Sequence, residues 1–191
     1  MIYELKINLK GIKPKIWRTI QVDSNISLNE LHHVIQISMG WTNSHLYSFK
    51  IDEIEYSLPE YNYDYHTYGD SRSYRLSDFQ EESFGYLYDF GDYWEHNIQV
   101  IRKIEGKKLL HPICFEGEGC CPPEDVGGIH GFKEFLDIMK DLSHPERKSY
   151  IVWYGSIFNP DKISLSKINS NLTKLDQYIY EIENNDEKDL V

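Results

Sequence analysis

The sequence predicts an α+β fold, with an antiparallel or mixed sheet that opens with a hairpin–helix–hairpin unit and carries two C-terminal helices. Apolar and polar residues alternate over 2–9 and again over 92–100, which is typical of strands with one buried face. A capped helical pattern between these regions ends at Met39, and two more helical patterns lie at 132–143 and 171–183. This succession of elements favours one sheet with helices packed against it.

The first expected hairpin joins a strand over 2–9 to a second strand over 15–22. In the first strand, apolar residues occupy every second position from Tyr3 to Leu9. The intervening residues 11–14 contain glycine and proline, which favour a turn.

The first helix is predicted by its boundary residues. Ser27 and Glu30 have the spacing of a capping box, in which each side chain accepts a hydrogen bond from a backbone N–H group at the helix start. Gly40 provides a left-handed stop. The helix contains the neighbours His32 and His33, which cannot share one helix face, so at most one is expected to point inward.

After this helix, residues 45–57 predict two short strands around Asp52 and Glu53, which complete the hairpin–helix–hairpin unit. The tyrosine-rich stretch 58–83 has no clean periodicity and is expected to be a long loop. The strand pattern returns from Tyr86.

In the strand region that follows the long loop, Asp92, Trp94 and His96 fall on one mostly apolar face. A short strand is expected at 112–115, and a loop dominated by turn residues at 116–130. The two C-terminal helices complete the predicted fold.

The chain has 191 residues, enough for one sizeable core, and a single domain is expected over 1–183. The acidic residues 184–191 are expected to form a disordered tail. No apolar run approaches the roughly 20 residues that span a bilayer, and the N-terminus lacks the pattern of a secretory signal. With three cysteines, an odd number that argues against a disulfide framework, these features predict a soluble cytoplasmic protein.

The formal net charge of −11 opposes a general role in binding nucleic acid, because such binding needs lysine and arginine to neutralise phosphates. The N-terminal hairpin is a local exception, since its cations include Lys13, Lys15 and Arg18. Any contact with DNA is therefore expected to be weak and confined to that hairpin.

The most concentrated chemistry lies in Tyr88–His96, Cys114 and Cys121–Gly128. Within the first block, Asp92 and His96 permit two interpretations. In the structural one, Asp92 holds the preceding turn and His96 is a core histidine bonded to a carbonyl. In the functional one, both side chains line a cleft, where the carboxylate fixes the imidazole tautomer.

The loop that follows Cys121 contains two prolines and Gly127–Gly128, residues that fix a particular backbone shape. It presents Glu124 and Asp125, which could coordinate a cation, bind a basic peptide or cap the following helix. Cys114 and Cys121 do not have the spacing of a zinc knuckle, so a structural zinc site is not expected.

Several blocks together carry a family resemblance: Ile16-Trp17-Arg18, Met39-Gly40-Trp41, His45-Leu46, Tyr88–His96, the Cys-Pro-Pro-Glu-Asp-x-Gly-Gly block and Trp153-x-Gly155-x-x-Phe158-x-Pro160. The chain resembles the plasmid pRiA4b Orf-three-like family, which is also catalogued among insertion-element passenger proteins under a TnpR, or resolvase, label. The resemblance implies an α+β fold and an association with mobile elements, with no defined biochemical role. A serine recombinase needs an arginine-rich active site, which this acidic chain lacks. The chain has His45-Leu46-Tyr47-Ser48-Phe49 where the family commonly has His-Leu-His-x-Phe.

Three functions are therefore open. The first expectation is a non-enzymatic recognition module, without a cofactor, that binds a peptide or protein partner through a cleft lined by tyrosines and the Cys-Pro-Pro-Glu-Asp loop. The alternative is a metal-assisted hydrolase or nuclease. It would use residues among His45, Asp92, His96, Cys114 and Glu124, of which His96, Cys114 and Glu124 are candidate ligands of a divalent metal. The third is a mobile-element accessory protein that contacts DNA. The residues expected at the cleft are His45, Asp89, Asp92, Trp94, His96, Cys114, Cys121, Glu124 and Asp125.

Overall fold

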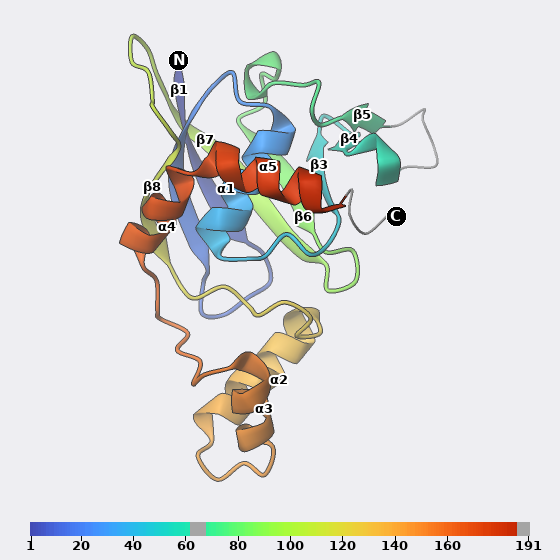
Figure 1. Cartoon of the computed structure of the whole chain (residues 1–191), viewed down its shortest axis with the longest axis vertical. Helices are drawn as coiled ribbons and strands as arrows, with labels where there is room; N and C mark the ends of the chain where they lie inside the picture. Colours follow the sequence, from blue (N-terminus) through green and yellow to red (C-terminus); the bar gives the residue numbers. More distant parts are fainter. Residues whose placement is uncertain (62–67, 187–191) are drawn as a thin grey trace.

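The computed structural model describes residues 1–61 and 68–186, and the strands of this part form one mixed sheet. Its eight strands run in the order β5-β4-β3-β6-β7-β1-β2-β8, and neighbours are antiparallel except for the parallel pair β4 and β5 (Figure 1). The strands are β1 (Ile2–Leu9), β2 (Trp17–Asp23), β3 (Tyr47–Ile51), β4 (Ile54–Ser57), β5 (Tyr68–Asp70), β6 (Ser83–Tyr88), β7 (Trp94–Ile104) and β8 (Ile113–Glu118). The helices are α1 (Leu28–Met39), α2 (Gly128–Lys140), α3 (Arg147–Tyr154), α4 (Leu165–Leu172) and α5 (Leu175–Asp186).

The predicted α+β class and its hairpin–helix–hairpin unit are confirmed, since β1 and β2 are followed by α1 and then by β3 and β4. α1 starts with the predicted capping box: Ser27 Oγ accepts from the N–H of Glu30 at 3.1 Å, and the Glu30 carboxylate accepts from the N–H of Ser27 at 2.7 Å. Gly40 ends the helix with φ 99°. Between β3 and β4, Asp52 and Glu53 have φ values of 48° and 62°, the left-handed backbone of a two-residue hairpin turn.

The C-terminal half has two more helices than the sequence predicts. α2 and α5 overlap the predicted helices, whereas α3 and α4 are additional. In α3 the apolar residues run continuously over 150–154 and none is fully buried, so the sequence shows no helical periodicity there. α4 and α5 are separated by a short break between Leu172 and Leu175, which are both buried. Because Leu172 and Leu175 are three residues apart, the helical apolar pattern continues across the break, and the sequence does not show where α4 ends and α5 begins.

The stretch predicted as a long loop, 58–83, contains the short strand β5, two 3₁₀ turns and the start of β6, while 62–67 lie outside the described residues. Backbone carbonyls of its described part accept hydrogen bonds from the start of α1. The N–H groups of the first two residues of α1 donate to the carbonyls of Tyr74 and Ser71, both at 3.0 Å. A helix start leaves such groups without an intrahelical partner. Because backbone atoms make these contacts, the side-chain pattern carries no trace of them.

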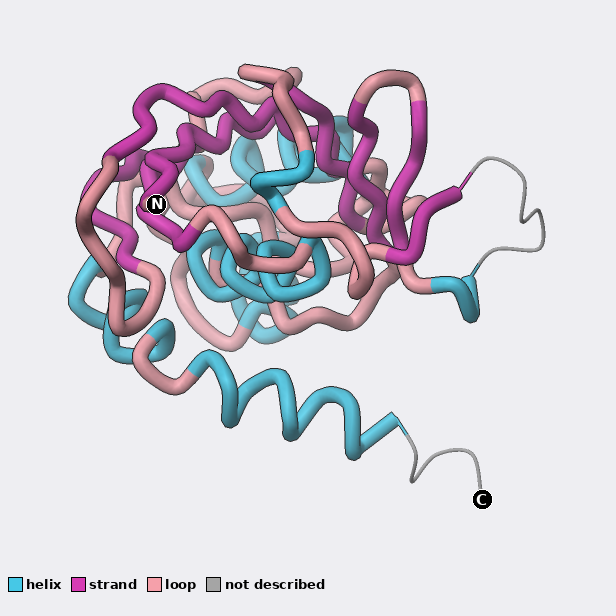
Figure 2. Tube along the Cα trace, turned by 90° about the horizontal axis from the view of Figure 1, so that it is seen from above, coloured by secondary structure: helices cyan, strands magenta, loops and turns pink. Residues whose placement is uncertain are grey.

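α1 is covered on two sides, by the sheet and by the C-terminal helices α4 and α5 (Figures 1 and 2). Every residue of α1 except Glu30 is buried. The prediction that at most one of His32 and His33 points inward is therefore wrong. His32 stacks on Tyr47 of β3 with ring centroids 3.6 Å apart, and His33 packs edge-on against Tyr178 of α5 at 5.8 Å.

Tyrosine hydroxyls of the sheet bond to polar side chains of α1. The hydroxyl of Tyr86 accepts from Gln36 Nε2 at 3.0 Å and lies 2.8 Å from His32 Nδ1. The hydroxyl of Tyr47 donates to Asn29 Oδ1 at 2.7 Å. Both tyrosines are buried, so they belong to the core and not to an open cleft.

The buried face of β7 holds Trp94, His96 and Ile98, as the alternation predicts. Asp92 does not belong to this face, because β7 begins only at Trp94. Tyr93 has φ 59°, which interrupts the extended backbone and leaves Asp92 in the turn between β6 and β7. The predicted strand is therefore two residues too long at its start.

α2 and α3 form a lobe at one end of the molecule (Figure 1). Phe132 of α2 packs edge-on against Trp94 of β7, with ring centroids 6.5 Å apart, so the lobe is joined to the sheet through aromatic contact.

Within 1–61 and 68–186, the helices are too short or too polar to cross a bilayer. α5 continues to Asp186, so the first residues of the expected disordered tail are helical, and 187–191 lie outside the described part.

Candidate functional site

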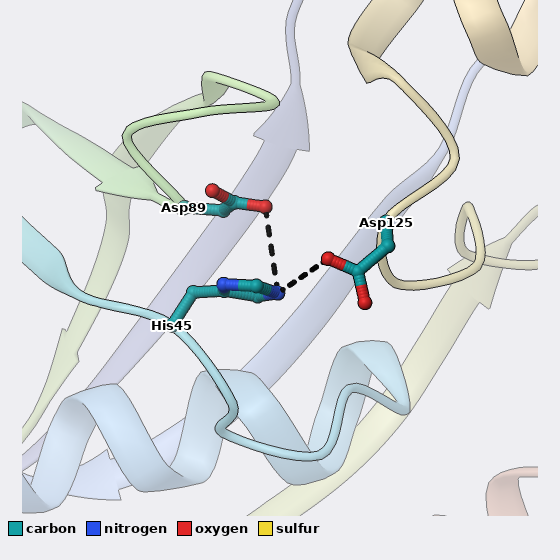
Figure 3. Close-up of side chains that lie close together, drawn as sticks. All are labelled: His45, Asp89 and Asp125. Carbon is teal, nitrogen blue, oxygen red and sulfur yellow. Dashed lines mark ion pairs between the residues drawn. The ribbon is translucent and has the colours of Figure 1, made fainter.

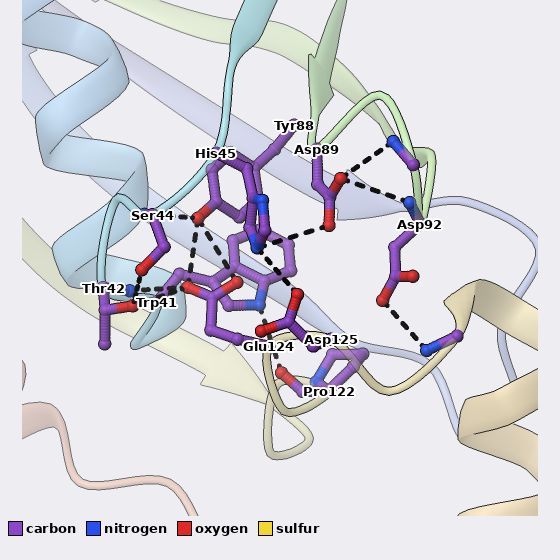
Figure 4. A network of polar contacts seen from close by, with 12 residues as sticks. Trp41, Thr42, Ser44, His45, Tyr88, Asp89, Asp92, Pro122, Glu124 and Asp125 are labelled. Carbon is purple, nitrogen blue, oxygen red and sulfur yellow. Dashed lines mark hydrogen bonds and ion pairs between the residues drawn. The ribbon is translucent and has the colours of Figure 1, made fainter.

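Three irregular segments meet where β6 ends and the neighbouring strand β3 begins (Figure 4). They are the segment between α1 and β3, the turn between β6 and β7, and the loop between β8 and α2. Loops held together by a rigid sheet are common positions for functional side chains. The first segment carries Trp41, Thr42, Ser44 and His45, the second Asp89 and Asp92, and the third Pro122, Glu124 and Asp125.

His45, Asp89 and Asp125 bring one ring nitrogen and two carboxylate oxygens within 4.8 Å of one another (Figure 3). His45 Nε2 lies 3.2 Å from Asp125 Oδ1 and 3.7 Å from Asp89 Oδ2. This nitrogen is out of contact with solvent and makes no hydrogen bond to any described residue. Within the described part of the chain, no other group of three or more histidine, cysteine, aspartate or glutamate side chains converges in this way.

The two carboxylates of this cluster differ in exposure, since the side chain of Asp89 is 8% exposed and that of Asp125 is 73% exposed. Asp89 Oδ1 accepts from the N–H groups of Gly91 at 2.8 Å and Asp92 at 3.2 Å, while Oδ2 points at His45 (Figure 3). Asp89 and Asp125 have φ values of 57° and 56°, which are uncommon outside glycine. The fold therefore holds both carboxylates in unusual backbone conformations beside one imidazole.

Glu124 lies in the same loop as Asp125 but bonds to the segment that precedes β3. Its Oε1 accepts from the N–H of Thr42 at 2.8 Å, the hydroxyl of Thr42 at 3.0 Å and the hydroxyl of Tyr88 at 3.0 Å. The Tyr88 hydroxyl accepts in turn from the N–H of Ser44 at 3.0 Å. Burial, and then the Glu124 carboxylate, raise the pKa of Tyr88, so its hydroxyl stays protonated.

Two more contacts fix the loop between β8 and α2 (Figure 4). Trp41 Nε1 donates to the carbonyl of Pro122 at 3.1 Å, and the N–H of Gly127 donates to Asp92 Oδ2 at 3.1 Å. Gly127 is the N-cap of α2 and has no side chain to cap the helix. Its N–H group instead donates to the Asp92 carboxylate from the β6–β7 turn, so the expected capping by Glu124 or Asp125 is not observed. Gly128 has φ 66°, and a Cβ atom there would lie 2.6 Å from the carbonyl oxygen of Asp92. The predicted glycine pair is thus required for close approach of the two loops.

His96 lies in the core and not in this network. Its Nδ1 is 3.3 Å from the carbonyl of Tyr86, and its ring packs edge-on against Trp41 at 5.3 Å. Burial lowers the pKa of His96 to about 3, which keeps the imidazole neutral. No hydrogen bond or ion pair among the described residues joins it to Asp92 or Glu124.

Cys114 and Cys121 are buried thiols, Cys114 in the edge strand β8 and Cys121 in the loop between β8 and α2. Burial raises the pKa of Cys114 to about 11 and raises that of Cys121 well above its usual range. Protonated thiols are weak nucleophiles and weak metal ligands. Of the residues expected for the metal-assisted alternative, His45 belongs to the cluster, whereas Asp92, His96, Cys114 and Glu124 do not.

The basic N-terminal hairpin does not present all of its cations. Arg18 is 2% exposed and donates to backbone carbonyls. Lys10 pairs with Glu95 at 2.5 Å. Lys13 and Lys15 are exposed, so the surface available for phosphate contact is smaller than the sequence indicates.

Sequence reasoning selected His45, Asp89 and Asp125 without grouping them, and it missed Thr42 and Tyr88 as partners of Glu124 in holding the loop. The available signal was Gly40, which ends α1 and makes an irregular segment follow it. The contacts themselves join segments far apart in the chain, which no local pattern records.

Comparison with known proteins places the chain in one family. The family described as plasmid pRiA4b ORF-3-like protein matches residues 1–167. The uncharacterized protein y4hQ of Sinorhizobium fredii is 39% identical over 158 residues, which are 81% of this chain and 81% of that protein. The crystal structure of a protein of unknown function from Methanosarcina mazei Go1 matches with a TM-score of 0.77 and 31% identity, over 87% of this chain and 95% of that chain. The chain therefore belongs to the plasmid pRiA4b ORF-3-like protein family.

Proposed function

We propose that this protein binds a divalent transition-metal cation through His45, Asp89 and Asp125 and uses it in metal-assisted hydrolysis. The observation that carries the proposal is the buried Nε2 of His45, which has no hydrogen bond among the described residues and faces two carboxylate oxygens. Buried polar atoms ordinarily have a partner, and a metal ion is a common partner of a neutral imidazole.

The spacing of the ligand atoms supports this proposal. Zn²⁺ bonds of about 2.0–2.2 Å to nitrogen and oxygen place neighbouring ligand atoms roughly 3–3.6 Å apart. The two distances from His45 Nε2, 3.2 and 3.7 Å, are close to that range. An imidazole among carboxylates favours zinc, manganese or iron over magnesium and calcium, which prefer oxygen ligands alone.

The negative charges of Asp89 and Asp125 also favour a divalent cation at this cluster. Asp89 and Asp125 bring two negative charges together, and among the described residues their ion-pair partner is His45. Carboxylate oxygens within 4.8 Å of each other repel. A divalent cation neutralises both carboxylates while the imidazole binds in its neutral form.

The ligand number favours catalysis over a purely structural role. Three protein ligands leave coordination positions for water, as in catalytic zinc sites. A metal ion held by these three residues would lower the pKa of a bound water and so supply the nucleophile that hydrolysis needs. The exposed side chain of Asp125 leaves this site open to a substrate.

The test is calorimetric titration of the chelator-treated protein with Mn²⁺ and Zn²⁺. The wild-type protein is expected to bind one equivalent of metal, and Asp89→Asn, Asp125→Asn and His45→Gln are each expected to weaken binding by at least about 100-fold, more than loss of an outer-shell partner does. Asp137→Asn, an exposed carboxylate on α2, is the matched control and should bind as the wild type does.

Asp125→Asn is the variant that separates ligation from folding, because that side chain is 73% exposed and asparagine keeps its size and one oxygen. Wild-type protein that takes up no metal at millimolar concentration contradicts the proposal. Equal affinity in Asp125→Asn and Asp137→Asn contradicts it as well.

A second candidate function is recognition of a basic segment of a peptide or protein partner. A hollow of about 270 Å³ lies between the Cys-Pro-Pro-Glu-Asp loop and α3, lined by Asp125, Val126, Ser149, Tyr150 and Trp153. A carboxylate beside the exposed ring of Trp153 and the half-buried ring of Tyr150 suits a lysine or arginine side chain through ion pairing and cation–π contact.

This second function predicts that an unstructured lysine-rich peptide binds and that its glutamate-substituted counterpart does not. Trp153→Ala is expected to weaken binding about tenfold, whereas Tyr180→Ala, an exposed aromatic on α5, should not. Fluorescence anisotropy of the labelled peptide measures both affinities. Because both proposed functions use Asp125, Mn²⁺ should displace the peptide. Equal binding of the lysine-rich and the glutamate-substituted peptide contradicts the recognition function.

A further inference from the structure

A second cavity lies between the end of α1 and the helices α4 and α5, and its lining does not include the cluster residues His45, Asp89 and Asp125. Its volume of about 510 Å³ falls in the range of small-molecule sites. Three lysines, Lys162, Lys167 and Lys174, line it, and Glu181 is the acidic residue that faces them.

These lysines are unusual in a chain with a net charge of −11. Among the described residues, the ion pairs of lysine and arginine involve Lys10, Lys50, Arg72 and Arg75, so the three lysines of the cavity are unpaired. With Glu181 as one acidic residue against three lysines, the lining keeps a net positive charge, which attracts an anion.

The start of α4 adds to this positive field. Ser164 is the N-cap of α4 and lines the cavity, so the positive end of the helix dipole faces the same space. Lys167 belongs to the first turn of that helix. A phosphate group placed here meets both the helix start and the ammonium groups.

Part of the cavity lining is apolar. It includes Ile37, Met39 and Trp41 from the end of α1 and the segment after it, and Ile168 from α4. The cavity thus combines lysine side chains, the start of α4 and an apolar part of the lining.

We propose that this cavity binds a small phosphate monoester with an apolar or aromatic body. The three lysines and the start of α4 suit a dianionic phosphate better than a singly charged carboxylate. The apolar part of the lining accounts for the body of the ligand, and Trp41 gives a fluorescence signal from the lining itself. The site is separate from the proposed metal ligands, so each can fail alone.

The test is titration of the full chain with phenyl phosphate, followed by tryptophan fluorescence and calorimetry. Inorganic phosphate lacks the apolar body and phenol lacks the charge, so each is expected to bind at least tenfold more weakly than phenyl phosphate. Benzoate is expected to bind several-fold more weakly.

The double variant Lys167→Ala, Lys174→Ala is expected to lower the affinity for phenyl phosphate at least tenfold. The matched control is Lys107→Ala, Lys108→Ala, which removes two exposed lysines from the loop between β7 and β8. Asp125→Asn should leave the affinity unchanged. Equal affinity of the two double variants, or of phenyl phosphate and inorganic phosphate, overturns the proposal, as does wild-type protein that does not bind phenyl phosphate at millimolar concentration.

Discussion

The free energy of unfolding is expected to fall steeply as the pH is lowered from about 6.5, the ordinary pKa of histidine. His32, His33 and His96 are 1%, 3% and 0% exposed. Burial lowers the pKa of His33 to about 4 and that of His96 to about 3. Burial, and then the neighbouring His33, lower the pKa of His32 well below its usual value.

The sign of the effect follows from which state binds protons. Below about pH 6.5 the unfolded chain protonates these histidines, while the folded protein keeps them neutral down to pH values near their lowered pKa. Each histidine therefore removes up to about 1.4 kcal/mol of stability per pH unit, or about 6 kcal/mol for the three together by pH 5. That loss is comparable with the whole stability of many domains, about 5–15 kcal/mol.

Urea unfolding followed by circular dichroism at pH 7.5, 6.5, 5.5 and 5.0 measures this dependence. His96→Leu removes one of the three titrating groups and should reduce the slope by about one third, whatever its effect on stability at pH 7.5. His130→Gln, on the exposed surface of α2, is the control and should leave the slope unchanged. A free energy of unfolding that is constant from pH 7.5 to 5.0 contradicts the neutral burial of these imidazoles.

The histidine pair also shows where sequence reasoning stops. The capping box at Ser27 and Glu30 was predictable because its partners are three residues apart. The burial of His33 was not, because it depends on Tyr178 of α5, which comes from the other end of the chain. A helix between two layers has no solvent face, and the rule that opposite helix faces differ in exposure then fails.

The candidate site divides in the same way. Asp89 and Asp125 could be selected from the sequence because carboxylates in turn-rich segments are candidate ligands. Their meeting with His45 depends on the register of β3 against β6, which pairs Tyr47 with Tyr88 and so places the starts and ends of these strands together. Asp92 was assigned to a strand because alternation continues through it, and the positive φ of Tyr93 that ends the strand leaves no mark in the sequence.

The strongest single-residue effect is expected at Arg18. Its guanidinium is buried and donates to four carbonyls, and these bonds join β2, the end of α1 and the end of β8. Nε donates to Ser38 at 2.8 Å, Nη1 donates to Trp17 at 2.7 Å and to Glu118 at 2.9 Å, and Nη2 donates to Gly119 at 2.9 Å.

The place of Arg18 explains why a charge without a carboxylate partner is stable there. Ser38 lies in the last turn of α1, which has no basic residue of its own, so Arg18 supplies the positive charge that the helix C-terminus favours. Burial lowers the pKa of Arg18, but a guanidinium stays protonated in proteins. Gly117 leaves room for the side chain, because a Cβ atom there would lie 2.8 Å from Arg18 Cδ.

Arg18→Met is therefore expected to lower the free energy of unfolding by roughly 5 kcal/mol or more, since each buried acceptor left without a donor costs about 1–3 kcal/mol. Arg18→Lys keeps the charge but replaces the planar fork by one ammonium, so it should destabilise the protein less, while still costing more than about 2 kcal/mol. Arg102→Met, on the exposed part of β7, is the control and should change stability by less than about 0.5 kcal/mol. Guanidinium unfolding of the three variants ranks them, and if Arg18→Met does not fold, Arg18→Lys still gives a measurable value. The role assigned to Arg18 is wrong if Arg18→Lys unfolds at the same denaturant concentration as Arg102→Met, because four backbone acceptors from three elements cannot lose their shared donor without loss of stability.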